Sequence, residues 1–232
     1  MIIKRPSQER GHADHGWLRS WHSFSFADYY DPAHMGYRSL RVINEDIVAP
    51  QGGFPLHPHR NMEIVTYIIS GQLQHADSMG NGSIISTGQI QTMGAGTGVR
   101  HSEFNPSADK PVHLLQIWIQ PEKTGLPPRY AEWHPPKDIS AEPLSLLVSP
   151  DGRNGSAQIA QDALIWLCKL PAGEKVTIPV GANRGLWVQV FRGCLRTGDL
   201  ELNTGDAAAI EDQETIELIG VNEAEALVFD LR

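Results

Sequence analysis

The segment PLHPHRNMEIVTYIISG, residues 55–71, combines a histidine pair with the pattern of a buried β-strand. Side chains of a strand alternate between its two faces, so His57 and His59 lie on one face, roughly 6.6 Å apart along the strand. Met62–Ser70 is then rich in β-branched residues and ends at Gly71, which is typical of a strand followed by a tight turn. Two imidazoles at this spacing can converge on one ion inside a barrel.

A second pair of ligand-type residues follows in Arg100-His101-Ser102-Glu103. The same alternation places His101 and Glu103 on one face. The two pairs offer three neutral nitrogens and one carboxylate, a donor set suited to iron, nickel, copper, manganese or zinc. A single histidine is more often a hydrogen-bonded residue than a ligand, but two such pairs favour a metal site. The alternative is a closed structural zinc site, because four ligands also suit tetrahedral zinc.

The rest of the chain reads as short strands separated by turns. Glycine and proline make up 38 of the 232 residues, more than the average of about 12%. No long segment has the 3.6-residue period of an amphipathic helix. The sequence therefore predicts an all-β fold, whose clearest strands, besides Met62–Ser70, are His113–Ile119, Ala163–Leu170, Gly185–Phe191 and Ala226–Leu231.

A short internal similarity suggests that the β units are duplicated. YIISGQL, residues 67–73, resembles QVFRGCL, residues 189–195, and a Thr-Gly pair follows each copy, at 87–88 and 204–205. Two similar units in tandem predict two barrels. Chance similarity between short β patterns is the alternative.

The two halves differ in their chemistry. All ten histidines lie between His12 and His134; the chain carries 11 basic and 12 acidic residues up to His134, and 8 and 15 after it. Seven prolines lie between Pro121 and Pro150 (121, 127, 128, 135, 136, 143 and 150), which favours a connector over sheet interior. We therefore expect a domain boundary near residue 135, with residues 1–134 and 135–232 as the two domains and any imidazole chemistry in the first.

Composition excludes several functional classes. A net charge of −8 argues against a nucleic-acid binder and against a polybasic membrane-surface protein. No apolar run approaches the ~20 residues of a membrane span, and no signal peptide is visible. Cys168 and Cys194 cannot form a disulfide framework and are expected to be core thiols of a cytoplasmic protein. A monomer is expected, since no exposed apolar stripe is evident.

The histidine motifs resemble those of the cupin superfamily. Cupins carry G-x5-H-x-H-x3,4-E-x6-G and then G-x2-H-x3-N; this chain has His57-x-His59-x3-Glu63 and Gly98-x2-His101-x3-Asn105. It departs from the first motif in two ways: residue 51 is glutamine where glycine is expected, and Gly71 comes one residue late.

In these departures and in the added Glu103, the chain resembles the pirin branch of the cupins. The resemblance covers most of residues 5–120, with weaker support to the C-terminus. It is carried, besides the histidine motifs, by Arg10-Gly11, His15–Leu18, Trp21–Ala27, Leu40–Asn44 and Gly96–Gly98.

The resemblance implies a bicupin with a metal only in its N-terminal barrel. The ligands carried over are His57, His59, His101 and Glu103, and the ion is expected to be Fe(2+), with nickel, copper, manganese or zinc as alternatives. If the strand is regular, Glu63 keeps the parity of His57 and His59, and it is interpreted as a group that supports the ligands or as a structural carboxylate, with metal ligation the minor alternative.

The resemblance also implies a reaction. Pirin-like proteins are associated with quercetin 2,3-dioxygenase activity, so the expected partners are a small flavonol-like aromatic and O2, with carbon monoxide released on ring opening. Glu103 is the candidate catalytic base for the flavonol 3-hydroxyl. The alternative function is a non-catalytic, redox-dependent regulatory module that binds a protein partner. An oxygenase needs an apolar pocket over the metal, whereas a regulator needs an exposed loop or patch beside it.

Several other polar residues carry weaker expectations. His113 and Gln116 have opposite parity, so at most one can face the metal. His12 and His15 are expected to hold a loop rather than a second metal, and His75-x-Asp77 is expected at a hydrogen-bonding strand edge. His22 with Trp21, Phe24 and Phe26 indicates strand packing, with some of these aromatic residues candidates for the pocket wall. The arginines considered for an anionic entrance are Arg10, Arg38 and Arg41.

Overall fold

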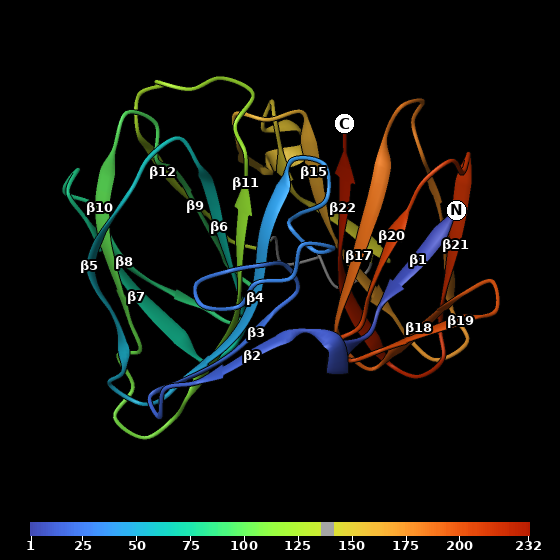
Figure 1. Cartoon of the computed structure of the whole chain (residues 1–232), viewed down its shortest axis with the longest axis horizontal. Coiled ribbons are helices and arrows are strands. Elements are labelled where there is room, and N and C mark those ends of the chain that lie inside the picture. Colours follow the sequence, from blue (N-terminus) through green and yellow to red (C-terminus); the bar gives the residue numbers. More distant parts are fainter. Residues whose placement is uncertain (136–141) are drawn as a thin grey trace. The chain divides into compact units, whose positions relative to one another are not determined.

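The computed structural model describes residues 1–135 and 142–232, which are built almost entirely of β-strands (Figure 1). The chain divides into two compact units. The first barrel comprises Gly11–Pro135 and Ala157–Gln161; the second comprises Met1–Arg10, Asp162–Arg232 and the described part of residues 136–156. The predicted all-β class with two barrels is confirmed.

The first barrel is built from two antiparallel sheets. One has seven strands in the order β12-β9-β6-β11-β4-β3-β2, and the other has four in the order β5-β10-β7-β8. Figure 1 shows these two sheets facing each other. Its strands are β2 (Gly11–Asp14), β3 (Leu18–His22), β4 (Leu40–Val48), β5 (Gly53–His59), β6 (Glu63–Ser70), β7 (Gln72–Asp77), β8 (Gly82–Ser86), β9 (Ile90–Gly94), β10 (Val99–Phe104), β11 (Val112–Ile119), β12 (Arg129–Trp133) and the short β14 (Ala157–Gln158).

The second barrel repeats this topology. Its larger sheet has seven strands in the order β1-β20-β17-β22-β15-β13-β14, and its smaller sheet has four in the order β16-β21-β18-β19. Its elements are β1 (Ile2–Arg5), the 3-10 turns η1 (Ser7–Glu9) and η3 (Arg153–Gly155), β13 (Leu144–Ser149), β15 (Ala163–Leu170), β16 (Lys175–Pro179), β17 (Gly185–Arg192), β18 (Cys194–Thr197), β19 (Leu200–Asn203), β20 (Ala207–Ile210), β21 (Thr215–Gly220) and β22 (Ala224–Leu231).

The internal similarity marks equivalent hairpins of the two barrels. Gly71 links β6 to β7 and Gly193 links β17 to β18, with φ of 87° and 72°. A Cβ on Gly71 would lie 2.8 Å from the Pro111 carbonyl oxygen, so this turn requires glycine both for its positive φ and for space. The duplication is therefore structural, and the five strands expected from sequence are all present.

The N-terminus contributes to the second barrel. β1 pairs with β20 in the register Ile2↔Ile210 to Arg5↔Ala207, and Lys4 Nζ lies 2.7 Å from the Asp206 carboxylate. Strand β12 has the equivalent position in the first barrel, beside β9. The division expected from sequence assigns residues 1–10 to the first domain and residues 157–161 to the second, whereas the structure groups each segment with the other unit.

The proline-rich segment contains sheet as well as connector. Pro127 and Pro128 directly precede β12, which lies at the edge of its sheet, where a missing backbone donor is tolerated. Pro143 directly precedes β13. The expectation of a connector was therefore wrong for these two strands, although β12 lies at a sheet edge and not in the sheet interior. Pro136 lies outside the described residues.

The two interiors differ. The second barrel is filled by a cluster of buried aliphatic residues that includes Val188, Ala208 and Val228, and by the thiol of Cys168. Cys168 and Cys194 are both buried and unbonded to each other, as expected. Among the described residues, no helix is long and apolar enough to cross a membrane. The first barrel instead has polar side chains in its interior.

Candidate metal centre and its cavity

Three histidines converge inside the first barrel as the alternation predicts. Strands β5 and β10 pair so that His57 lies opposite His101, and His59 follows on the same face of β5. The ring centroids lie 4.4 Å apart for His57 and His101, 4.8 Å for His57 and His59, and 4.9 Å for His59 and His101. One donor atom from each ring lies within 4.8 Å of the others, so the three imidazoles can share one ion.

Hydrogen bonds leave a nitrogen of these rings available for a metal. His57 Nδ1 donates to the Pro55 carbonyl oxygen at 2.7 Å, so Nε2 keeps its lone pair. His101 Nε2 is buried and has no hydrogen-bond partner within the described chain. A buried nitrogen without a partner is costly, and a metal ion would satisfy it.

Two of the rings are also held neutral, as ligands must be. Burial, together with the neighbouring His57, lowers the pKa of His59 to about 4. Burial and the neighbouring imidazoles lower the pKa of His101 well below its usual range. His59 and His101 therefore present lone pairs rather than competing positive charges.

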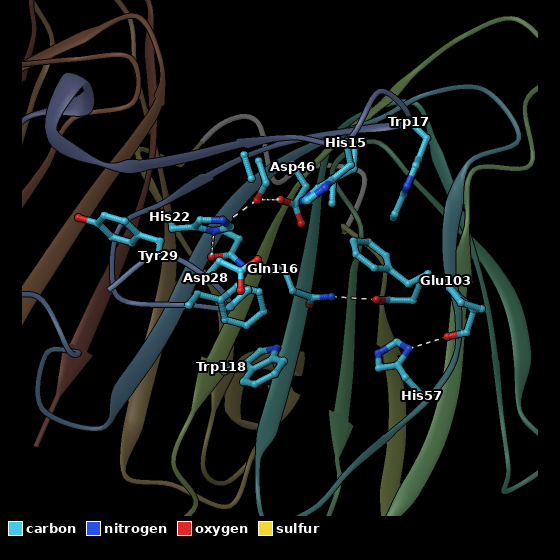
Figure 2. A pocket seen from close by; sticks show the side chains of 18 of the residues that line it. His15, Trp17, His22, Asp28, Tyr29, Asp46, His57, Glu103, Gln116 and Trp118 are labelled. Atoms are coloured by element: carbon cyan, nitrogen blue, oxygen red, sulfur yellow. Dashed lines mark hydrogen bonds between the residues drawn. The ribbon is translucent and has the colours of Figure 1, made fainter. Parts of the chain in front are cut away.

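Glu103 joins this group from the same strand. The register of β10 against β5 shifts between His101 and Glu103, which ends opposite Phe54. A Glu103 oxygen lies within 4.8 Å of a His101 ring nitrogen. Gln116 Nε2 on β11 donates to Glu103 Oε2 at 2.9 Å (Figure 2), and the Thr66 hydroxyl lies 3.4 Å from Oε1. The structure thus brings the predicted residues into two groups that share His101: one is His57, His59 and His101, and the other is His75, His101 and Glu103.

The carboxyl of Glu103 is not paired with a cation in this site. Burial and the nearby Asp46 raise its pKa to about 7, against the opposing hydrogen bonds from Thr66 and Gln116. A buried carboxyl without a counter-charge is stabilised when a cation binds beside it. The lack of a counter-charge beside Glu103 and the lack of a partner for the His101 nitrogen both fit the binding of a divalent metal.

His75 was missed as part of this centre. The prediction of a strand edge was wrong, since β7 lies between β10 and β8. Gln91 Nε2 donates to His75 Nδ1 at 3.0 Å, and His75 Nε2 lies 3.4 Å from Asp77. Both ring nitrogens therefore have hydrogen-bond partners, although a His75 nitrogen also lies within 4.8 Å of donor atoms of His101 and Glu103. Its Nδ1 faces His101 Nδ1 at 3.5 Å. Because Nδ1 of His101 makes this contact, Nε2 is the ring nitrogen of His101 that is available to a metal.

Glu63 has a structural role. Strand β5 ends at His59 and β6 begins at Glu63 in the other sheet, so the parity of the histidines does not continue to it. Arg129 Nη2 donates to Glu63 Oε2 at 2.7 Å, and the Ala160 N–H also donates to this carboxylate. Burial raises the pKa of Glu63, and Arg129 opposes that rise. Of the two interpretations of this residue, the structural carboxylate is the one that the contacts support.

A cavity of about 730 Å³ opens beside the histidines. His57, His59 and Glu103 line one part of it. Aromatic rings line its walls: Phe26 packs edge-on against Trp118 at 5.4 Å, and Trp17 packs edge-on against Phe54 at 5.1 Å. This size and lining suit a flat, largely apolar organic molecule.

Other histidines of the first half serve the cavity or the fold. His12 and His15 line the cavity, and the His12 ring lies tilted against Trp21 with the ring centroids 5.2 Å apart. His22 lines it too, and hydrogen bonds to Asn44 at 2.8 Å rather than only packing. Of the aromatic residues near His22, Phe26 is a wall residue, whereas Trp21 and Phe24 are absent from the described lining.

The remaining candidates lie elsewhere. His113 Nε2 lies 3.0 Å from Glu45, while Gln116 contacts Glu103, so one of the two reaches the metal side as the parity argument requires. Arg10, Arg38 and Arg41 are not among the described residues that line the cavity, and Arg41 donates instead to the Ser25 carbonyl oxygen at 2.9 Å. The proposed anionic entrance therefore has no support from them.

Comparisons with known proteins agree with the fold and the motifs. The sequence profile of the family Pirin matches residues 4–119, and that of the quercetinase C-terminal cupin domain matches residues 146–231. A quercetin 2,3-dioxygenase of Escherichia coli strain K12 is 44% identical over 231 residues, which cover 100% of this chain and 99% of that protein.

Solved structures show the same likeness. The crystal structure of YhhW from Escherichia coli is 44% identical with a TM-score of 0.97, covering 100% of this chain and 98% of that one. A structure of the bacterial pirin YhhW in complex with nickel(II) is also 44% identical, with a TM-score of 0.95 and coverage of 100% and 99%. The chain therefore belongs to the pirin family and consists of two cupin barrels.

Proposed function

We propose that this protein is a metal-dependent dioxygenase that opens the central ring of a flavonol such as quercetin. The observation that carries the proposal is the group formed by His57, His59 and His101, with His57, His59 and Glu103 at the wall of an aromatic cavity. The name of the 44% identical Escherichia coli relative supports the reaction, and the nickel complex of YhhW supports a divalent metal.

The cavity favours an enzyme over the regulatory alternative. A regulatory site needs an exposed surface beside the metal, whereas His101 and Glu103 are 0% and 2% exposed. Aromatic walls next to a buried donor set are a feature that small-molecule sites share.

The ligand roles are part of this proposal. His57, His59, His101 and Glu103 would hold one divalent ion, expected to be iron or nickel. The ion would supply a Lewis-acid centre and an electron conduit between the flavonol and O2. Trp118 and Phe54 would orient the flat substrate against this wall, and the apolar surround would exclude water.

The reaction balances with O2 as the only co-substrate. The bonds from C3 to C2 and C4 break, both atoms of O2 join C2 and C4, and C3 leaves with its oxygen as carbon monoxide. The remaining atoms form one ester-linked product with a new carboxyl group. Glu103 is the proposed acceptor of the 3-hydroxyl proton, which the new carboxylate takes back.

Oxygen uptake tests the proposal. Protein purified without oxygen and loaded with one equivalent of iron(II), nickel(II) or manganese(II) is mixed with quercetin, and O2 consumption and carbon monoxide release are recorded. Equal amounts of both are expected, with loss of both in His57→Ala. The matched control is His113→Ala, because that histidine pairs with Glu45 and makes no contact with the cluster.

The outcome that overturns the proposal is stoichiometric metal without oxygen uptake for all three ions. Uptake without carbon monoxide would retain a dioxygenase and remove the ring-opening reaction given above.

A further inference from the structure

The inner face of the seven-stranded sheet carries a row of polar residues that the metal centre uses only in part. The register places Gln91, Thr66, Gln116, Asn44 and His22 opposite one another across β9, β6, β11, β4 and β3. The equivalent row of the second barrel consists of Ala208, Val188, Val228 and Trp166. The fold is therefore compatible with an apolar row at these positions, so the polar one serves something else.

The first part of the row belongs to the metal centre. Gln91 donates to His75, and Gln116 donates to Glu103. The Thr66 hydroxyl donates to Gln116 Oε1 at 2.9 Å, which holds that amide in place. These contacts account for three of the five residues.

The second part makes its own cluster, which we call the distal cluster and define as Ser20, His22, Asn44 and Asp46. His22 Nδ1 bonds Asn44 Oδ1 at 2.8 Å, and the Ser20 hydroxyl donates to Asp46 Oδ1. All four residues line the cavity and are 2% to 5% exposed. Figure 2 shows His22 and Asp46 on one side of Gln116, with Glu103 and His57 on the other.

The distal cluster presents unused hydrogen-bonding atoms to the cavity. Within the described chain, Asn44 Nδ2 and Asp46 Oδ2 have no hydrogen-bond partner, although both residues are almost fully buried. Polar atoms that line a cavity and are not used by the protein itself are available to a ligand. One amide donor and one carboxyl oxygen side by side match two adjacent hydroxyl groups, since a hydroxyl both donates and accepts.

Strand spacing relates the two ends of the cavity. Asn44 and Asp46 lie on β4, one strand spacing, about 5 Å, from Gln116 on β11, and Gln116 reaches Glu103 of the other sheet through a 2.9 Å hydrogen bond. A molecule that reaches from Glu103 to the distal cluster must therefore extend past the Gln116 side chain. The aromatic walls between the two ends require it to be flat.

We propose that the distal cluster is a substrate-recognition subsite, which binds the two adjacent hydroxyl groups of the flavonol ring farthest from the metal-binding oxygens. This inference rests on the proposed function for the class of molecule. It assigns Asn44 and Asp46 the role of binding residues, with His22 and Ser20 holding them in position. The selected substrate is a flavonol whose outer ring is a catechol.

Binding without turnover tests the subsite. Quenching of tryptophan fluorescence is titrated in nickel-loaded protein without oxygen, using quercetin and galangin, the flavonol that lacks both outer-ring hydroxyl groups. Wild type is expected to bind quercetin at least tenfold more tightly. In Asn44→Leu the ratio of the two affinities falls to near one, while galangin affinity is unchanged.

A matched control and a milder variant distinguish loss of the subsite from loss of the fold. Glu45 lies between Asn44 and Asp46 on β4, but its side chain pairs with His113 on the opposite face of the strand. Glu45→Gln is therefore expected to keep the wild-type ratio of quercetin to galangin affinity. Ser20→Ala removes one bond to Asp46 and reduces the ratio by a smaller factor. Nickel stoichiometry and thermal melting confirm that each variant is folded.

The inference is overturned if wild type binds both flavonols equally, or if Asn44→Leu keeps the wild-type ratio while folded. Because affinities are measured without oxygen, the two proposals fail separately. If no oxygen is consumed but quercetin still binds more tightly than galangin, the dioxygenase proposal fails and the subsite stands. If oxygen is consumed but the two flavonols bind equally, only the subsite fails.

Discussion

Replacing Gln116 with leucine is expected to weaken metal binding without removing any ligand. Gln116 Nε2 donates to Glu103 Oε2 at 2.9 Å, and Glu103 is buried without a cation partner. Leucine occupies a similar volume but leaves that oxygen without its donor. The carboxyl then holds its proton more tightly, and a metal must compete with that proton.

The magnitude follows from the single bond that is lost. A hydrogen bond to a charged group contributes about 1.5–3 kcal/mol, which corresponds to roughly 10- to 100-fold in affinity. Partners that orient metal ligands have effects in the same range, about 10- to 100-fold. The Thr66 hydroxyl loses its acceptor on Gln116 and lies 3.4 Å from Glu103 Oε1, so it can turn to that oxygen. This compensation favours the lower end, about tenfold.

Nickel affinity is measured by competition with a chromophoric chelator, and the fold is followed by thermal melting. Gln189→Leu is the matched control, because Gln189 is a fully buried glutamine on β17 of the second barrel that bonds the Gly205 carbonyl oxygen. It is expected to lower stability and leave nickel affinity unchanged. Wild-type affinity in folded Gln116→Leu would refute the role given to this amide, and equal losses in both variants would attribute the effect to general loosening.

Three further predictions address other parts of the first barrel. His75→Phe should retain one nickel per chain at about 10- to 100-fold lower affinity, whereas His59→Ala should lose stoichiometric nickel. Metal analysis after gel filtration measures both. The reverse pattern would make His75 a ligand. Burial raises the pKa of Asp46 to about 7, above its unfolded value of 3.8, so the folded state binds the proton more tightly and wild-type stability falls as pH rises from about 4 to 7. Urea unfolding of metal-free protein should show a flatter pH profile for Asp46→Asn, and parallel profiles would contradict the assignment. Arg129→Met leaves the buried Glu63 carboxyl without its cation and should cost about 1–3 kcal/mol in urea unfolding, with nickel stoichiometry unchanged; loss of nickel would give Glu63 a part in the metal centre.

Much of the site could be predicted because it depends on spacing within single strands. His57 with His59, and His101 with Glu103, are pairs two residues apart, and alternation of side chains determines which residues share a face. The five expected strands and the duplicated hairpins follow from runs of β-branched residues that end at glycine. The same alternation predicts that at most one of His113 and Gln116 faces the metal side, and Gln116 is the one that contacts Glu103.

The parts that could not be predicted depend on register between distant strands. Glu63 is held by Arg129, 66 residues later, and His75 reaches His101 only because β7 lies beside β10. The polar run Asn44–Asp46 inside an apolar strand was a signal that something polar faces the interior, but it did not say what. Only the pairing of β4 with β3 and β11 shows that two of these residues join the cavity.

The sequence by itself determined the all-β class, the duplication, the half of the chain that carries the histidines and the two candidate ligand pairs. The tertiary structure decided which residues support those ligands, which barrel the N-terminal strand completes, and that a cavity with a second polar wall lies beside the cluster. The reason is physical. Alternation and turn chemistry act over a few residues, whereas a cavity exists only where strands far apart in the chain are brought into one register by the packing of both sheets.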